Sequence, residues 1–316
     1  MFDLHKASVK KTIKRSLLII GIAFIGILAY TSWDVLLANI QRANTFFLIS
    51  SVVLAISGLF INGVYFQTLL LKHGCEAHAS DGVKAFVTSQ AAKYIPGKVW
   101  GVAYQIAHLG ANKQSMASVS FAVVQANVEF VLGAIVFTLF TALAAVAWIV
   151  SPIYSLLVVG LGAVVFASLS SSFMVRAFIQ GIVVRLFGLS GQAAARNRST
   201  WKVSVMLFMG QSALYFFSLV FAIHSVFELS VNDMLVVIAI HSFSVVASSL
   251  VFLVPAGVGV REILFFALSK LLPLELTLEE LAALVVLLRA LQIVIEATAI
   301  GLAQFISPSR QRTRQR

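Results

Sequence analysis

Five charged side chains lie inside apolar segments of this sequence: Glu129, Arg261, Glu262, Arg289 and Glu296. A charge inside a bilayer costs at least about 2.5–3.5 kcal/mol on insertion scales, so such residues turn toward the protein interior and often mark an ion or substrate path. Arg289 and Glu296 are seven residues apart, so on a helix they share one face. We expect the five charges to converge near the bilayer midplane. Internal ion pairs that only hold helices together are the alternative.

Two stretches interrupt long apolar runs with proline, glycine and cations. They are Lys93–Gly101, which reads KYIPGKVWG, and Leu253–Glu262, which reads LVPAGVGVRE. Proline removes a backbone donor and clashes with the preceding turn, so a helix entering the first stretch should break near Ile95. A second short helix can then begin at Pro96. Because broken backbone survives in a bilayer only where protein or a watery cavity satisfies it, we predict two re-entrant helical hairpins around a cavity.

The second arm of each predicted hairpin points its N-terminus into the membrane. Free N–H groups and a partial positive charge make that end an anion site, and a lipid phosphate is the natural anion there. Lys98 and Arg261 lie in or near these first turns. Tyr94 and Trp100 suit an interfacial depth, where plain anchoring is the alternative to substrate contact. The predicted headgroup-binding residues are Lys93, Tyr94, Pro96, Gly97, Lys98, Trp100, Pro255, Gly257, Arg261 and Glu262.

The composition predicts the class of protein. The 316 residues are 60% hydrophobic and 11% charged, and the mean hydropathy is +0.98. In a soluble domain about 25% of residues are charged. The sequence therefore predicts an all-α membrane protein that crosses the bilayer several times. The net charge of +11 is concentrated in the tails and one loop, so membrane topology explains it better than nucleic-acid binding.

Hydropathy predicts about six full spans and two hairpins in one transmembrane domain, residues 16–306. The predicted spans are 16–33, 46–71, 115–150, 152–178, 203–227 and 281–306. The first hairpin covers about 83–109, and its arms of about 13 residues are too short to cross a core of about 30 Å. The second covers 234–272, but its first arm, 234–254, could cross alone, so an eight-span count stays open. Residues 32–44 are expected to form a short outer loop.

Basic residues fall on one side of the predicted spans. They cluster in the N-terminal tail 1–15, in 176–202 and in the C-terminal tail 307–316, as is typical of cytoplasmic segments. We therefore expect both termini in the cytoplasm. The halves 46–150 and 203–306 then run through the membrane in opposite directions, each with one hairpin. This arrangement predicts an inverted-repeat, transporter-like architecture, with shared membrane composition as the alternative explanation for the likeness.

The remaining polar residues give weaker signals. His73, Cys75 and His78 lie close enough to suggest a metal site, but no second ligand cluster appears. We interpret them as a polar loop and expect no metal and no cofactor. The glycosylation sequon 197–199 lies in a predicted cytoplasmic segment and is discounted, and no Walker loop, nucleophile elbow or HExxH motif is present. Interhelical hydrogen bonds are expected from Gln125, Asn127, Gln211 and His241.

In their order and spacing, the two interrupted stretches resemble those of the lysylphosphatidylglycerol synthase transmembrane-domain family, the flippase-like membrane region of the multiple-peptide-resistance proteins. The resemblance covers about residues 15–306 and implies a multi-span fold with re-entrant elements and a role with phospholipids or lipid-linked glycans. Ala256 stands where many members have a second glycine. This difference leaves open how tight the turn after Pro255 is in this chain. The sequence ends at Arg316 without the soluble domain that transfers the aminoacyl group, so aminoacyl-lipid synthesis is not expected. The matching motif positions are Pro96, Gly97, Lys98, Trp100, Pro255, Gly257, Arg261 and Glu262.

The leading hypothesis is a bacterial inner-membrane protein that binds an anionic phospholipid or lipid-linked glycan intermediate and translocates it between leaflets. One alternative is a membrane-embedded enzyme of cell-envelope glycan or lipid assembly, in which Glu129 or Glu262 would act as a base. A non-catalytic membrane scaffold is the other. The lack of a recognised catalytic motif favours transport, so we name no catalytic residue. The expected partners are the membrane and an anionic lipid, not nucleic acid, and a homo-oligomer is left open.

Overall fold

The structure, a computed structural model, is built from helices. It describes residues 26–27, 29–31, 33–75, 78–95, 100–110, 116–171, 181, 185, 201–251, 254–272 and 274–306. Within these ranges the chain forms α-helices and short 3₁₀ helices and contains no strand, which confirms the predicted all-α class.

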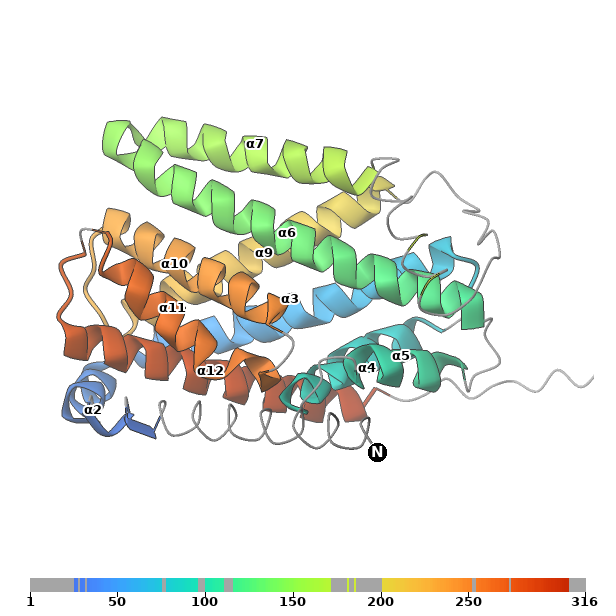
Figure 1. Ribbon diagram of the computed structural model, residues 1–316, viewed down its shortest axis with the longest axis horizontal. Coiled ribbons are helices and arrows are strands. Elements are labelled where there is room, and N and C mark those ends of the chain that lie inside the picture. The colour runs from blue at the N-terminus through green and yellow to red at the C-terminus, as the bar shows by residue number, and fades with distance from the viewer. Residues whose placement is uncertain are drawn as a thin grey trace, which may run out of the picture.

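Long apolar helices run along the long axis of the molecule and form a bundle (Figure 1). In the described part of the chain, five are long and apolar enough to cross a membrane: α3 (Thr45–Lys72), α6 (Met116–Val150), α9 (Trp201–His224), α10 (Val231–Leu250) and α12 (Leu278–Gln304). Helix α3 packs along α9, and α6 packs against both α10 and α7 (Pro152–Ser171). Because α10 could cross by itself, the choice between six and eight spans stays a prediction.

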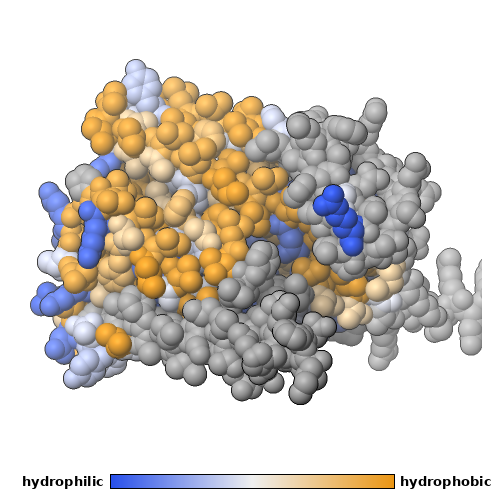
Figure 2. All heavy atoms as spheres, in the orientation of Figure 1, coloured by the Kyte–Doolittle hydropathy of each residue, from blue (hydrophilic) through white to orange (hydrophobic). Residues whose placement is uncertain are grey.

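Much of the apolar surface of these helices faces away from the protein. In the most apolar stretch of α3, only 17% of the residues are buried inside the molecule. Figure 2 shows hydrophobic side chains across the middle of one face, while hydrophilic ones gather at one end. Apolar surface left in water costs about 25 cal/mol per Å², so this exterior requires a lipid environment. The protein is a multi-pass membrane protein, as the composition predicted.

Local sequence signals set where several of these helices begin. The Asn44 side chain accepts a hydrogen bond of 3.1 Å from the backbone N–H two residues later, at the start of α3. Ser230 caps α10 in the same way, and Thr277 and Glu280 form a capping box on α12. Each such cap contributes about 1 kcal/mol, and together they place the bundle helices close to the predicted boundaries.

Two helical hairpins lie at opposite ends of the molecule, and their tips meet near its middle beside α12 (Figure 1). The first consists of α4 (Ala79–Ser89), the 3₁₀ helix η1 (Gln90–Tyr94) and α5 (Trp100–Gly110). Its helix breaks where the sequence predicted, because Ile95 is extended with φ −85° and ψ 131°. The second consists of α10, the 3₁₀ turn η3 (Pro255–Gly257) and α11 (Val260–Ser269).

The tip of the second hairpin uses left-handed backbone. Gly257 and Gly259 have φ angles of 66° and 83°, which glycine adopts without steric cost. A Cβ atom on Gly257 would also lie 2.8 Å from the Cβ atom of Ser248. Ala256 has φ 49°, a conformation that costs an ordinary residue about 1–2 kcal/mol. The turn is therefore tight although alanine occupies the position where glycine is common in the resembling family.

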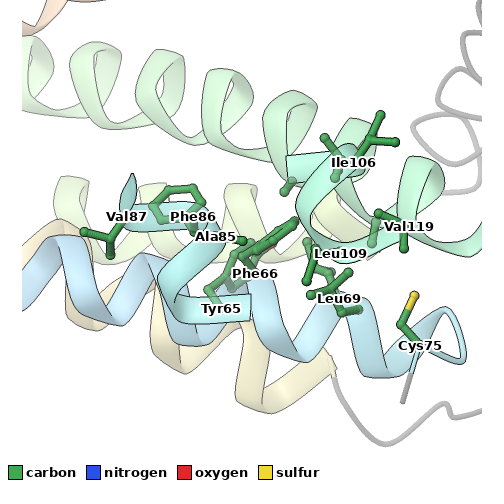
Figure 3. Packing of buried hydrophobic residues seen from close by; sticks show 14 of the residues in the cluster. Tyr65, Phe66, Leu69, Cys75, Ala85, Phe86, Val87, Ile106, Leu109 and Val119 are labelled. Atoms are coloured by element: carbon green, nitrogen blue, oxygen red, sulfur yellow. The ribbon is translucent and has the colours of Figure 1, made fainter. Parts of the chain in front are cut away.

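The first hairpin is fixed to α3 by a continuous apolar core. Phe66 of α3 packs with Phe86 of α4 and Leu109 of α5 (Figure 3). The helices approach closely at Gly63, where an added Cβ atom would lie 3.0 Å from Cγ1 of Val83. This packing holds the hairpin in a defined position against the bundle.

One predicted segment is wrong over most of its length. Residues 32–44 were expected to form an outer loop, but Trp33–Arg42 form the amphipathic helix α2, which packs on α12 and buries Leu36. Apolar residues at positions 33, 36, 37 and 40 recur at helical spacing and suit one face of a helix better than a loop. The predicted first span 16–33, the basic cluster 176–202 and the tail 307–316 lie wholly or mostly outside the described residues.

Candidate functional site

The hairpin tips and the bundle helices surround a central cavity of about 530 Å³. Its wall includes residues from α3, α6, α9, α10 and α12 and from both hairpins. Small-molecule sites commonly measure about 300–1,000 Å³, so the polar headgroup of a lipid fits such a volume. Among the described lining residues, the charged ones are Lys93, Arg261 and Glu296.

The tip of the first hairpin is bound to α12 through Glu296. The Lys93 ammonium forms an ion pair with Oε1 of this carboxylate, and the Tyr94 hydroxyl donates to Oε2 at 2.9 Å. Gln292, one turn earlier on α12, donates its amide N–H to Oε1 at 2.8 Å. The carboxylate therefore has a donor or a cation on each oxygen.

Arg261 in the first turn of α11 brings the second hairpin to the same cavity. Its guanidinium donates to Oε1 of Gln292 at 2.5 Å and to Nε2 of His241 at 2.7 Å. Arginine has no acceptor atom, so Nε2 of His241 must accept and the imidazole is neutral in this arrangement. No described carboxylate lies within 4.0 Å of the Arg261 nitrogens. Arg261 is thus a buried cation, 8% exposed, whose hydrogen-bond partners are neutral groups.

Glu262 and Arg289 hold the backbone of the second tip. Oε2 of Glu262 accepts from the N–H of Gly259 at 2.7 Å, which satisfies a free donor at the start of α11. Oε1 of Glu262 lies 4.0 Å from Nε of Arg289, and the Arg289 guanidinium lies 3.4 Å from the carbonyl oxygen of Ala256. Neither side chain lines the central cavity. Glu262 therefore supports the backbone of the tip and does not face the central cavity.

Glu129 departs from the expected convergence of charges. Its carboxylate accepts from the Tyr65 hydroxyl and from Nε2 of Gln125 at 2.7 Å. Oε1 of Gln125 in turn lies 2.6 Å from Nε2 of His73. Among the described residues, no cation lies within 4.0 Å of the carboxylate. Glu129 is 3% exposed and faces α3, so it is buried in protein as expected, but apart from the other four charges.

The neutral residues named from the sequence divide into two pairs. His241 and Gln125 form hydrogen bonds between helices, as expected. Asn127 and Gln211 bond within their own helices, Asn127 to a backbone carbonyl at 2.8 Å and Gln211 to the neighbouring Ser212 hydroxyl at 3.0 Å. Both also line the cavity, where a ligand can reach them.

His73, Cys75 and His78, which the sequence suggests as a possible metal site, have different surroundings in the structure. His73 bonds to Gln125, and Nδ1 of His78 lies 3.2 Å from the Ser80 hydroxyl. Cys75 is buried, and this burial raises the pKa of its thiol to about 11. In the part of the chain that the structure describes, no three His, Cys, Asp or Glu side chains are placed to hold a metal ion.

Gln292 is the main site residue that the sequence reasoning missed. It bridges Arg261 and Glu296, and so connects the two hairpins. Its position four residues before Glu296 on one helix face was a signal that could have identified it. Tyr65 carried no such signal, because its partner Glu129 lies 64 residues away in the chain.

The other predicted headgroup residues are described only in part. Pro96, Gly97 and Lys98 lie outside the described residues. Trp100 begins α5 and is half exposed. Pro255 belongs to the second tip through its backbone.

These features define a polytopic helical membrane protein with a cavity between two interrupted helical hairpins, whose wall carries Lys93, Arg261 and Glu296. The chain also matches the family described as the lysylphosphatidylglycerol synthase TM region, over residues 16–301. Because this match covers most of its length, the chain belongs to that family, as the two interrupted motifs predicted. Membership places it among membrane proteins of lipid or cell-envelope metabolism. A search of curated proteins gives no match.

Proposed function

We propose that this protein binds an anionic phospholipid or lipid-linked glycan intermediate in the central cavity and translocates it between the leaflets of a bacterial inner membrane. The observation that carries the proposal is the meeting of Lys93 and Arg261, from different hairpins, in the wall of one cavity. In a low-dielectric interior such cations attract a phosphate far more strongly than they would in water. The acyl or prenyl chains of the bound lipid would stay in the bilayer.

The arrangement of the hairpins supports movement between leaflets. In this proposal both hairpins are re-entrant, α4–α5 from the cytoplasmic side and α10–α11 from the outer side, and both termini are cytoplasmic. The two hairpins lie at opposite ends of the molecule, so each would control access to the cavity from one side (Figure 1). Transporters with inverted repeats commonly place the substrate at the midplane, between interrupted helices.

A reconstitution experiment tests this function. The purified protein is placed in proteoliposomes with phosphatidylglycerol that carries a fluorescent label on one acyl chain, and a membrane-impermeant reductant bleaches the outer leaflet. We expect bleaching to continue beyond the outer-leaflet fraction that protein-free vesicles lose. Bleaching that stops at that fraction, with or without an added ion gradient, would contradict translocation. Conversion of the labelled lipid into a new product would instead favour an enzyme.

Native mass spectrometry identifies the bound lipid independently. We expect anionic lipids to remain bound to the protein when zwitterionic ones dissociate, because the cavity wall presents Lys93 and Arg261. Equal retention of both lipid classes would argue against a phosphate site.

A further inference from the structure

We infer that the cavity selects lipid phosphodiesters that carry one negative charge over phosphomonoesters and diphosphates that carry more. This inference rests on the proposed lipid-binding function and adds the charge of the headgroup to it. It begins with the described charged residues of the wall. Lys93 and Arg261 contribute two positive charges and Glu296 one negative charge, so the described residues of the wall sum to one positive charge.

The hydrogen bonds show which of the two cations is uncompensated. The Glu296 carboxylate is engaged by Lys93, Tyr94 and Gln292. Arg261 contacts the amide oxygen of Gln292 and the imidazole of His241. The imidazole adds no charge, because it accepts a hydrogen bond from a group that can only donate. The uncompensated positive charge therefore lies on Arg261.

Two charges outside the wall, on Glu262 and Arg289, cancel each other. Glu262 and Arg289 lie 4.0 Å apart at the closest, and both are directed to the backbone of the second tip. Their sum is zero, and neither lines the cavity. They leave the net charge of the wall unchanged.

This balance favours one class of occupant. Separated charge is costly in a membrane interior, so the bound state is most stable when wall and ligand together are neutral. A phosphodiester with an uncharged headgroup, whether a phosphatidyl lipid or a prenyl phosphate linked to a neutral sugar, supplies one negative charge. A phosphomonoester or a prenyl diphosphate supplies more and leaves an excess negative charge.

The experiment compares two lipids that differ by one methyl group. Phosphatidylmethanol and phosphatidic acid with identical acyl chains compete for the purified full-length protein against labelled phosphatidylglycerol. At about pH 8 phosphatidic acid is mostly dianionic, since the second pKa of a phosphomonoester is about 6. Phosphatidylcholine sets the baseline. We expect phosphatidylmethanol to compete at least about tenfold better than phosphatidic acid, because the second negative charge of phosphatidic acid has no uncompensated cation among the described residues of the wall.

Variants of the wall test the charge argument directly. Glu296→Gln raises the net charge to two positive and should reverse the order of the two lipids. The double variant Lys93→Met/Glu296→Gln returns the charge to one positive and should restore the original order. Arg261→Gln lowers the charge to zero and should remove most of the preference for either lipid over phosphatidylcholine. Glu279→Gln makes the same chemical change on the exposed first turn of α12 and should leave the order unchanged.

The outcomes separate this inference from the function on which it rests. Equal or tighter binding of phosphatidic acid by the wild type, or an unchanged order in folded Glu296→Gln, would overturn charge selection but leave lipid binding standing. Binding of neither anionic lipid above phosphatidylcholine would overturn both. Displacement of labelled lipid by inorganic phosphate as effectively as by phosphatidylmethanol would assign the site to a free anion and also overturn the inference. If Glu296→Gln does not fold, the double variant and Arg261→Gln decide.

Discussion

The ion pair between Lys93 and Glu296 joins the tip of the first hairpin to α12. On the same face of α12, Gln292 continues the contact to Arg261 in the second hairpin. The two hairpins are thus connected through two side chains, Glu296 and Gln292, on one face of α12. A displacement of either tip must rearrange these hydrogen bonds, so this row of residues is where opening of the cavity would be controlled.

Replacing one partner of the Lys93–Glu296 ion pair should destabilise the protein more than replacing both partners. We expect Lys93→Met to lower the free energy of unfolding by roughly 1–3 kcal/mol, because it leaves the Glu296 carboxylate buried without its cation. The loss is below that of a fully enclosed pair, since 31% of the Lys93 side chain is exposed. The double variant Lys93→Met/Glu296→Gln should recover part of it. Thermal unfolding in detergent measures both, and a double variant less stable than either single one would contradict this account.

Arg261 should not be replaceable by lysine. The guanidinium contacts Gln292 and His241 with two different nitrogens, and the single ammonium of lysine cannot reproduce that fork. We expect Arg261→Ala to weaken anionic-lipid binding at least about tenfold and Arg261→Lys to recover only part of it. Lipid competition on folded protein gives the affinities. Full recovery in Arg261→Lys would show that charge alone matters at this position.

Glu129 should contribute to stability rather than to transport. Glutamine at this position can still accept from Tyr65, but its amide group would face Nε2 of Gln125, whose oxygen is already engaged by His73. We expect Glu129→Gln to cost about 1–3 kcal/mol of unfolding free energy, the cost of one mismatched buried hydrogen bond. Transport should persist in the reconstituted protein. Complete loss of transport with an unchanged melting temperature would assign Glu129 a role in translocation instead.

The left-handed residues of the second tip should respond in opposite directions to substitution. Ala256→Gly relieves a positive φ angle, and after the greater entropy of the unfolded chain is subtracted we expect a gain of about 0.5–1 kcal/mol. Gly257→Ala places a Cβ atom 2.8 Å from that of Ser248 at φ 66° and should cost about 1–3 kcal/mol. Paired melting curves test this contrast. A loss of stability in Ala256→Gly would mean that the alanine methyl group provides packing that outweighs its strain.

Membrane orientation can be measured with single cysteines. We expect a cysteine at position 198 to react with a membrane-impermeant maleimide only after the cells are opened, because the basic cluster 176–202 is predicted to be cytoplasmic. Labelling in intact cells would overturn the topology.

The native cysteine should give little background in that experiment. Burial raises the pKa of Cys75 to about 11, and the thiolate is the reactive form, so its labelling should be low near pH 8 and increase only as the pH approaches 11. A Cys75→Ala chain provides the control. Rapid labelling of Cys75 near pH 8 would show that it is accessible.

The positions of the helices were largely predictable, because they depend on local sequence. Lipid requires long apolar runs, and residues such as Asn44 and Thr277 mark helix starts with their own side chains. Pro96 likewise indicated the break that the structure places at Ile95. The expectation of a loop over 32–44 overlooks apolar residues that recur at helical spacing, and the packing of this helix on α12 is decided by the tertiary structure.

The sequence by itself therefore determined the class of protein, its family, its two interrupted hairpins and the fact that its intramembrane charges are buried. These follow from composition, from proline chemistry and from the cost of placing charge in lipid. Only the tertiary structure decided which charges meet. Lys93 pairs with Glu296, which lies 203 residues further along the chain. Glu129 instead accepts a hydrogen bond from Tyr65, because α3 packs against α6 and brings the Tyr65 hydroxyl to its carboxylate. Such pairings depend on how helices distant in sequence are rotated and packed, and no local pattern encodes that.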